Sequence, residues 1–277
     1  MSNPFYLFMH IPKTAGTTLR SILDYQYGPE NVLTYYNQNS SQLLDNLDAS
    51  LCVGQNDYRA LIGHFQYGVH AQLTQPSKYI TFLRDPVKRA ISSYYENVKI
   101  MSPAVLDRDG NLMGLGTCLR EREEFFSNQQ LKMFIAKGAM DPVGKSDLEI
   151  AQKNMERDFI FSGISEYFDA SILLLSRLIG WNPCAYGTLN ARPTQERLEA
   201  EDLSTLRRIN HLENILYQDA LDNLLRNIRC AGKSFDSALT ELSNTTSEAA
   251  KREIQAAQPL PDDCFAINDF LNLAKIS

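Results

Sequence analysis

The sequence lacks the features that define several large classes of protein. No stretch reaches the roughly 18 to 20 consecutive apolar residues that a membrane span needs. The opening segment, MSNPFYLFMH, has neither a basic region nor a cleavage site, so we expect no signal peptide there. The 5 cysteines form no CxxC pair, which is typical of reduced thiols. We therefore expect a cytoplasmic protein without a membrane span.

An excess of basic residues is also missing. The chain has 27 Lys and Arg against 33 Asp and Glu, a net charge of -6, which gives no electrostatic case for nucleic acid as a partner. Any anion would have to be bound by a local cluster. Because 277 residues with 44% hydrophobic content can bury one substantial core, we predict a single domain. Its core would span about residues 1–230, with a helical extension at 231–277, and the sequence indicates no oligomeric state.

Short apolar runs alternate with helical patterns along the chain. Strands are expected at residues 5–11, 31–36, 59–65, 78–85 and 158–164. Helices are expected at 16–26, 41–50, 87–98, 121–137, 145–157, 166–179 and 203–229, a loop or lid at 101–118, and a surface helix with a linker at 243–263. This alternation predicts an α/β fold, with a central, mostly parallel sheet flanked by helices. Ligands of such sheets bind at the carboxyl ends of the strands.

The first strand runs into a polar turn, PKTAGTT, at residues 12–18. The N-terminus of a helix carries unpaired N–H groups and a partial positive charge, so it attracts anions. Ala15 and Gly16 let the backbone approach an anion closely, and Lys13 adds a positive charge. The same residues also suit a simple polar turn that Thr14 or Thr17 caps. The turn alone leaves both interpretations open.

This turn does not have the Walker A pattern, GxxxxGK[ST]. Its lysine comes before the glycine, and no Ser or Thr stands where that pattern places a magnesium ligand. We therefore expect no metal site. A nucleotide kinase or another phosphoryl-transfer enzyme with a divergent phosphate loop remains the alternative function.

A second strand-turn-helix unit has the sequence FLRDPVKRAISSYY. Arg84 ends the strand, and Ser92 follows eight residues later in the helix. A guanidinium group and a hydroxyl group can together clamp a phosphate, although Arg84 also suits an ion pair at the strand end. Asp85 and Pro86 suit a helix cap and a first-turn residue. Arg89 is open to a structural role or to a contact with the cofactor.

The 4 histidines are candidates for a general base. His64 follows a short strand in LIGHFQYG, which predicts a place at the edge of the sheet where the two turns lie. His10 suits packing or capping of the first turn, and His70 suits substrate binding. On its own, a histidine after a strand more often has a structural role. Glu30 and Glu96 remain alternatives as the base.

Together the two turns resemble those of carbohydrate sulfotransferases that use 3′-phosphoadenosine 5′-phosphosulfate (PAPS). HIPKTAGTTL resembles the 5′-phosphosulfate loop of this family and is most similar to the heparan sulfate 2-O-sulfotransferase group and its bacterial relatives. FLRDPVKRAISS resembles the segment that binds the 3′-phosphate. The resemblance runs over residues 5–230 and implies a P-loop-type three-layer fold and sulfuryl transfer from PAPS. The implied product is adenosine 3′,5′-bisphosphate, and the implied acceptor is a hydroxyl group on a carbohydrate or a glycosylated small molecule.

The resemblance also implies roles for individual residues. Lys13 would bind the donor and stabilise the leaving phosphate, and His64 would deprotonate the acceptor hydroxyl group for in-line transfer. Arg84 and Ser92 would hold the 3′-phosphate. The other residues implied to contact the cofactor are Thr14, Ala15, Gly16, Thr17 and Thr18 in the first turn and Asn190 and Arg192 in the segment TLNARP.

A further segment, EEFFSNQQLKMF, resembles a helix near the acceptor cleft of the family. Asn128, Gln129 and Gln130 within it suit either contacts with a sugar or the capping of a helix. We expect acceptor specificity to lie in residues 36–75 and 100–145, because loops vary most there.

Overall fold

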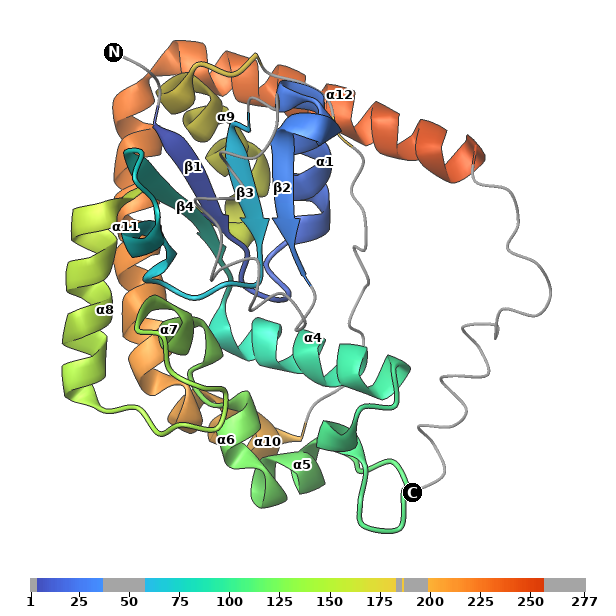
Figure 1. Cartoon of the computed structure of the whole chain (residues 1–277). Coiled ribbons are helices and arrows are strands. Elements are labelled where there is room, and N and C mark those ends of the chain that lie inside the picture. Colours follow the sequence, from blue (N-terminus) through green and yellow to red (C-terminus); the bar gives the residue numbers. More distant parts are fainter. Residues whose placement is uncertain (1–3, 37–57, 183–185, 187–198, 257–277) are drawn as a thin grey trace.

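A parallel sheet forms the centre of the fold in the computed structural model, which describes residues 4–36, 58–182, 186 and 199–256 (Figure 1). Within these residues the strand order is β2-β3-β1-β4-β5, and every neighbouring pair is parallel. The strands are β1 (Phe5–Met9), β2 (Val32–Tyr35), β3 (Ala60–Gly63), β4 (Ser77–Leu83) and β5 (Phe159–Ile164). The predicted parallel sheet is confirmed.

Helices cover both faces of the sheet. They are α1 (Gly16–Tyr27), α4 (Pro86–Lys99), α5 (Leu115–Glu121), α6 (Glu123–Phe126), α7 (Gln129–Phe134), α8 (Lys145–Asp158), α9 (Phe168–Ile179), α10 (Ala200–Ile209), α11 (His211–Ala231) and α12 (Lys233–Ala256), with short 3-10 turns η1 (Pro29–Asn31), η3 (Val69–Gln72), η4 (Pro103–Val105) and η5 (Ser165–Tyr167). Helices α1, α9 and α12 cover one face, and α7, α8 and α11 cover the other (Figure 1). Helix α4 crosses below the carboxyl ends of the strands. This is a three-layer α/β fold.

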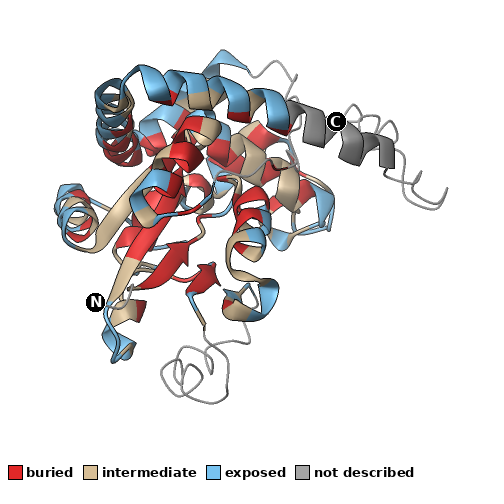
Figure 2. Cartoon of the chain, turned by 90° about the horizontal axis from the view of Figure 1, so that it is seen from above, coloured by how far each residue is buried: buried red, intermediate tan, exposed pale blue. Residues whose placement is uncertain are grey.

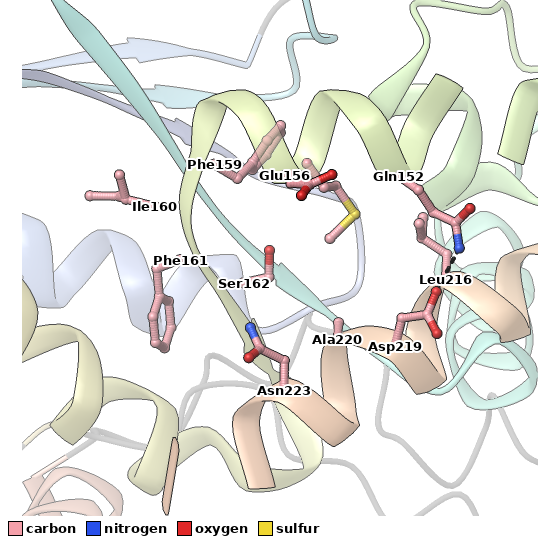
Figure 3. Close-up of a pocket in the computed structure, with 11 residues that line it drawn as sticks. Gln152, Glu156, Phe159, Ile160, Phe161, Ser162, Leu216, Asp219, Ala220 and Asn223 are labelled. Carbon is pink, nitrogen blue, oxygen red and sulfur yellow. Dashed lines mark hydrogen bonds between the residues drawn. The ribbon is translucent and has the colours of Figure 1, made fainter. Parts of the chain in front are cut away.

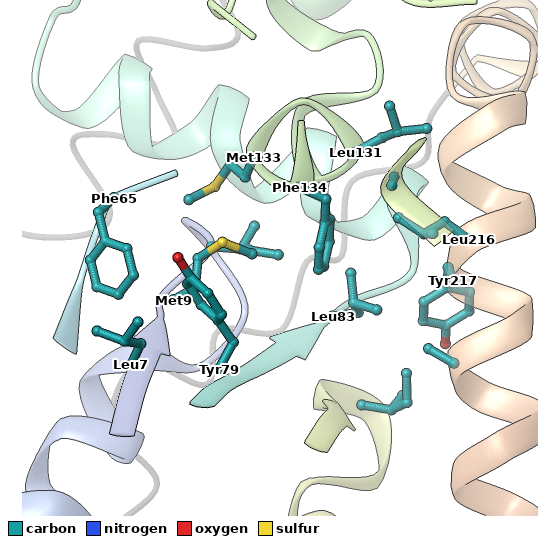
Figure 4. Close-up of a cluster of buried hydrophobic side chains, with 14 of the residues drawn as sticks. Leu7, Met9, Phe65, Tyr79, Leu83, Leu131, Met133, Phe134, Leu216 and Tyr217 are labelled. Atoms are coloured by element: carbon teal, nitrogen blue, oxygen red, sulfur yellow. The ribbon is translucent and has the colours of Figure 1, made fainter. Parts of the chain in front are cut away.

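The central strand β1 is buried along its whole length, and buried hydrophobic side chains cluster on both faces of the sheet. Figure 2 shows the buried residues in red in the sheet and on the packed sides of the helices. Leu7 and Met9 point to one face, where they pack with Phe134 of α7 and Leu216 of α11 (Figure 4). Phe8 points to the other face and packs against α1, α9 and α12. A fully buried side chain of this size contributes about 1.5–3 kcal/mol, so this strand fixes both layers around the sheet.

One predicted helix, at residues 203–229, is wrong because the chain breaks at Asn210 between α10 and α11. The Asn210 side chain is buried, accepts a hydrogen bond from the N–H of Asn128 at 2.7 Å, and donates one to the carbonyl of Leu206 at 2.9 Å. Asn128 itself interrupts the helix predicted at 121–137, with a φ of 50° between α6 and α7. The two breaks therefore stabilise each other.

The C-terminal part of the described chain is the long helix α12, which packs on α9. It includes residues 243–256 of the segment predicted as a surface helix with a linker at 243–263. The helix predicted at 41–50 lies outside the described residues. No helix in the described ranges combines the length and the apolar character that a membrane crossing requires. The predicted division into a core and a C-terminal extension stays a prediction.

Candidate functional site

Strand register brings three aromatic side chains together at the carboxyl edge of the sheet. Met9 of β1 is level with Gly63 of β3, and Gly63 is level with Tyr35 of β2. The residues that follow these strands are His10, His64 and Tyr36, and they therefore lie side by side. The His10 and His64 ring centroids are 4.5 Å apart, and those of Tyr36 and His64 are 4.9 Å apart.

Glycine is required at position 63 for this approach. A Cβ atom there would lie 1.9 Å from the carbonyl oxygen of Tyr35. The carbonyl of Tyr35 accepts a hydrogen bond from the N–H of His64 at 2.8 Å. Gly63 and the hydrogen bond of the His64 main chain therefore fix the position from which the His64 side chain extends.

The first turn has an unusual backbone, because two of its residues that are not glycine are left-handed. Lys13 has a φ of 74° and Ala15 a φ of 69°. Each such residue costs roughly 1–2 kcal/mol, a strain that is characteristic of functional sites. Helix α1 begins at Gly16 with no side-chain cap, which excludes the alternative in which Thr14 or Thr17 caps the helix. The first N–H groups of the helix have no acceptor within the helix and face the turn.

Small residues in this turn allow His10 to pack against it. A Cβ atom at Gly16 would lie 1.7 Å from Nε2 of His10. The hydroxyl of Thr14 is buried and donates to the carbonyl of Ile11 at 2.8 Å, which closes the turn. Thr18 is also buried, whereas Thr17 is exposed. The main chain, more than the threonine side chains, is thus the surface that this turn could offer to an anion.

The hydrogen bonding of His64 determines its tautomer. Its Nδ1 lies 2.8 Å from the carbonyl oxygen of His10, which can only accept, so Nδ1 carries the proton. In the neutral ring, Nε2 then holds the lone pair that a base needs. Among the described residues, no hydrogen bond to Nε2 is present. Desolvation lowers the pKa of His64 below 6.5, which the bond to His10 partly opposes, so the ring is neutral at pH 7.

The neighbours of His64 have perturbed ionisation as well. Burial, with smaller effects from His64 and Lys13, lowers the pKa of His10 to about 3. Desolvation also raises the pKa of Tyr36 to about 12, although the residue is 38% exposed. The Tyr36 hydroxyl lies 3.2 Å from Nδ1 of His10. Both groups are therefore neutral at pH 7 and support His64 by contact and by hydrogen bonding.

The two predicted anion-binding turns touch each other. Nη1 of Arg84 donates to the carbonyl oxygen of Lys13 at 3.1 Å. Burial lowers the pKa of Arg84, although Glu166 and Asp85 oppose this, and the guanidinium group stays charged. Nζ of Lys13 forms an ion pair with Oε2 of Glu96 of helix α4 at 3.1 Å. Two cations and the N-terminus of α1 are thereby placed side by side.

The second turn has the helix start that its sequence predicts. The carboxylate of Asp85 accepts a hydrogen bond from the N–H of Lys88 at 2.8 Å, and Pro86 is the first residue of α4. Ser92 is half-buried on α4, one turn before Glu96, so both side chains share the helix face toward Lys13. Arg89 is buried beside Glu213, which places it inside the protein and favours the structural alternative.

Other candidates lie elsewhere. His70 is hydrogen-bonded to the hydroxyl of Tyr79, in the first half of β4, and Glu30 precedes β2, so neither reaches the carboxyl edge. Asn190 and Arg192 lie outside the described residues. Tyr36 was missed as a site residue, although its position directly after a strand, like that of His64, was a usable signal.

A cavity of about 430 Å³ lies between α8, β5 and α11 and shares no lining residue with the site (Figure 3). Glu156 and Asp219 are at its rim, and Met155, Phe159 and Leu216 form its apolar part. Two carboxylates disfavour an anionic ligand there. This cavity is therefore a poor candidate for a phosphate-binding site.

The chain is similar to one family of known proteins over nearly its whole length. The model of the galactose-3-O-sulfotransferase family matches residues 2–269. No curated protein matches significantly. Among solved structures, a sulfotransferase from Alicyclobacillus acidocaldarius is similar at 13% identity and a TM-score of 0.40, over 76% of this chain and 97% of that chain.

Proposed function

The chain belongs to the galactose-3-O-sulfotransferase family and is a sulfotransferase, and on that premise we propose that its donor is PAPS and its acceptor a carbohydrate hydroxyl group. The observation that carries the donor assignment is the contact between the two turns, in which Arg84 donates to the carbonyl of Lys13 at 3.1 Å. A nucleotide with anionic groups at both its 5′ and 3′ ends suits two adjacent anion-binding turns. A mononucleotide would use only one of them.

The first turn suits the 5′ end of the donor. Its main-chain N–H groups from Thr14 to Thr18 bind the 5′-phosphate, and Lys13 neutralises charge that develops on it. Bound PAPS supplies the activated sulfuryl group. Glu96 must release Lys13 for this role, which is a small cost because the pair is partly exposed, at 26% and 43%. Arg84 and Ser92 bind the 3′-phosphate, and Asn190 and Arg192 are proposed as further donor contacts.

His64 is the proposed base. Its Nδ1 proton is directed to the carbonyl of His10, which leaves Nε2 to take the proton of the acceptor hydroxyl group. The base must be neutral, and the lowered pKa of His64 keeps it neutral to lower pH. We therefore expect kcat/KM to be constant from pH 8 down to about 6.5 and to fall only below pH 6.5, the ordinary value for histidine.

The acceptor is proposed to be a terminal galactose or a related sugar, because the matching family is named for that reaction. A kinase is not favoured, since the turn lacks the Walker A lysine and hydroxyl group. A cytoplasmic location and a single domain remain predictions.

Transfer of labelled sulfate from PAPS to a panel of galactosides tests this proposal. We expect wild-type turnover without magnesium, and a loss of about 10²–10⁴-fold in His64→Ala, the range for removal of a general base. His70→Ala is the matched control, because that ring lies away from the site. Turnover of His64→Ala equal to that of wild type would reject the histidine base. Absence of any sulfated galactoside would reject the acceptor class.

A further inference from the structure

The main chain of Arg84 is held by one side-chain amide. Oε1 of Gln130 accepts a hydrogen bond from the N–H of Arg84 at 2.9 Å, and Nε2 of Gln130 donates to the carbonyl of Arg84 at 2.9 Å. Arg84 follows the last residue of β4, where the pairing with β5 ends. The amide thus replaces a neighbouring strand and continues the sheet by one residue.

Gln130 is in turn fixed by Glu213 of helix α11. Nε2 of Gln130 donates to Oε1 of Glu213 at 2.7 Å, and the N–H of Gln130 donates to Oε2 at 2.7 Å. The side chains of Gln130 and Glu213 are both fully buried. Both amide atoms of Gln130 are therefore occupied inside the protein, and the sugar contact considered for this residue is excluded.

The charge of Glu213 is balanced by Arg89. Nε of Arg89 lies 3.5 Å from Oε1 of Glu213, and the two side chains are 3% and 0% exposed. Nε and Nη2 of Arg89 nevertheless make no hydrogen bond among the described residues. A buried pair with incomplete hydrogen bonding contributes little to stability, because desolvation offsets the attraction. A positional role explains this pair better than a stabilising one.

Arg89 and Arg84 belong to the same short segment. Arg84 directly follows β4, and Arg89 lies in the first turns of α4. Glu213 thus holds this segment twice, through Gln130 at its beginning and through Arg89 five residues later. With its main chain fixed and Nη1 bonded to the carbonyl of Lys13, Arg84 has few conformations left. A prepositioned guanidinium group loses little entropy when it binds a phosphate.

Resting on the proposed function, we propose that Gln130, anchored by Glu213, is a positioning residue that holds Arg84 for the 3′-phosphate of the nucleotide. Gln130 touches no ligand and acts through Arg84 alone. It thereby sets the preference of the enzyme for a nucleotide that carries a 3′-phosphate over one that does not.

A double-mutant cycle of Gln130→Met and Arg84→Ala tests this role, with adenosine 3′,5′-bisphosphate and 5′-AMP titrated by calorimetry. We expect Gln130→Met to weaken bisphosphate binding about tenfold and to change 5′-AMP binding less than about twofold. In the Arg84→Ala background the same change should have no further effect on either nucleotide. Equal losses for both nucleotides, or a full additional loss in the Arg84→Ala background, would overturn the proposal.

Gln129→Met is the matched control. The amide of Gln129 donates to carbonyls of Glu124, Ser127 and Ala139 and makes no contact with Arg84. The control should keep the wild-type preference. If Gln130→Met does not fold, Gln130→Asn keeps a buried amide that is too short to reach both Arg84 and Glu213, and the same result is expected of it.

The wild-type titration separates this inference from the proposed function. A wild-type protein that binds the bisphosphate no better than 5′-AMP contradicts the proposed function and the positioning role together. A wild-type protein with the preference, and a Gln130 variant that keeps it, contradicts the positioning role alone.

Discussion

The two turns that we propose to bind the donor are built differently. The turn after β1 relies on main-chain N–H groups, and its shape depends on the left-handed residues Lys13 and Ala15. The turn after β4 relies on a side chain, Arg84, whose main chain is held by the buried Gln130 and Glu213. The first turn therefore requires small side chains, and the second turn requires particular side-chain atoms of Arg84, Gln130 and Glu213.

The comparison teaches which substitutions each turn tolerates. A main-chain site is damaged by added atoms, since the backbone can no longer take its shape. A side-chain site is damaged by removed atoms, because a buried polar group is then left without a partner. Lys13 is the exception in the first turn, because the proposed function also needs the charge of its side chain.

Lys13→Ala has the largest expected effect and tests this exception. We expect kcat to fall about 10²–10³-fold, or about 3–4 kcal/mol, because the cation acts on charge that develops in the transition state. The melting temperature should change by less than about 5 °C, since the partly exposed pair with Glu96 contributes under about 1 kcal/mol. Lys88→Ala, an exposed lysine of α4, is the control. A Lys13→Ala enzyme with wild-type turnover would reject the role of the lysine.

Arg84→Ala removes the side chain on which the second turn depends. We expect bisphosphate affinity to fall about 10–100-fold, the range for hydrogen bonds to charged groups, while 5′-AMP affinity changes little. Turnover with saturating PAPS should fall less than in Lys13→Ala. Arg208→Ala, which removes an exposed ion pair with Glu123, should leave both affinities unchanged. An equal loss of affinity for the two nucleotides would show that Arg84 does not bind the 3′-phosphate.

Gly16→Ala adds one methyl group to the first turn. The new Cβ atom would lie 1.7 Å from the His10 ring, so the ring or the helix must move. We expect the free energy of unfolding to fall by about 1–3 kcal/mol, measured by urea denaturation. Gly114→Ala is the control, because a Cβ atom there meets nothing within 4 Å. Equal stability of the two variants would mean that the first turn tolerates bulk.

Glu96→Gln has the smallest expected effect. Removal of the carboxylate 3.1 Å from Nζ of Lys13 takes a negative charge away from the proposed donor site. We expect PAPS to bind about two- to fivefold more tightly, with a difference that shrinks in about 1 M salt. Glu121→Gln, an exposed carboxylate of α5, is the control. A hundredfold loss of turnover would instead identify Glu96 as the base.

Much of the fold could be predicted from the sequence because each strand is a distinct apolar run. The turns at Lys13 and Arg84 were recognisable, since their residue types and their places after strands are local features. The contact of His10 and His64 follows from the strand register once β1 and β3 are known to pair. The order of the strands in the sheet, in contrast, cannot be predicted from any single segment of the sequence.

The remaining features depend on tertiary structure. The apolar stripe continues across Asn210, so periodicity could not reveal a break that the distant Asn128 stabilises. The hydrogen bonds of Gln130 join segments that are 46 and 83 residues apart in the chain. Left-handed backbone at Lys13 and Ala15 was equally invisible, because neither residue favours it intrinsically.

Calorimetric titration of the wild-type protein with four nucleotides tests the central claim most directly. The ligands are adenosine 3′,5′-bisphosphate, 5′-AMP, 3′-AMP and ATP, each without and with magnesium. If the two turns bind the 5′- and 3′-phosphates of one nucleotide, the bisphosphate should bind at least about 100-fold more tightly than either monophosphate, independently of magnesium. Preferential binding of ATP with magnesium would contradict the account, because the first turn would then be a phosphate loop of another kind.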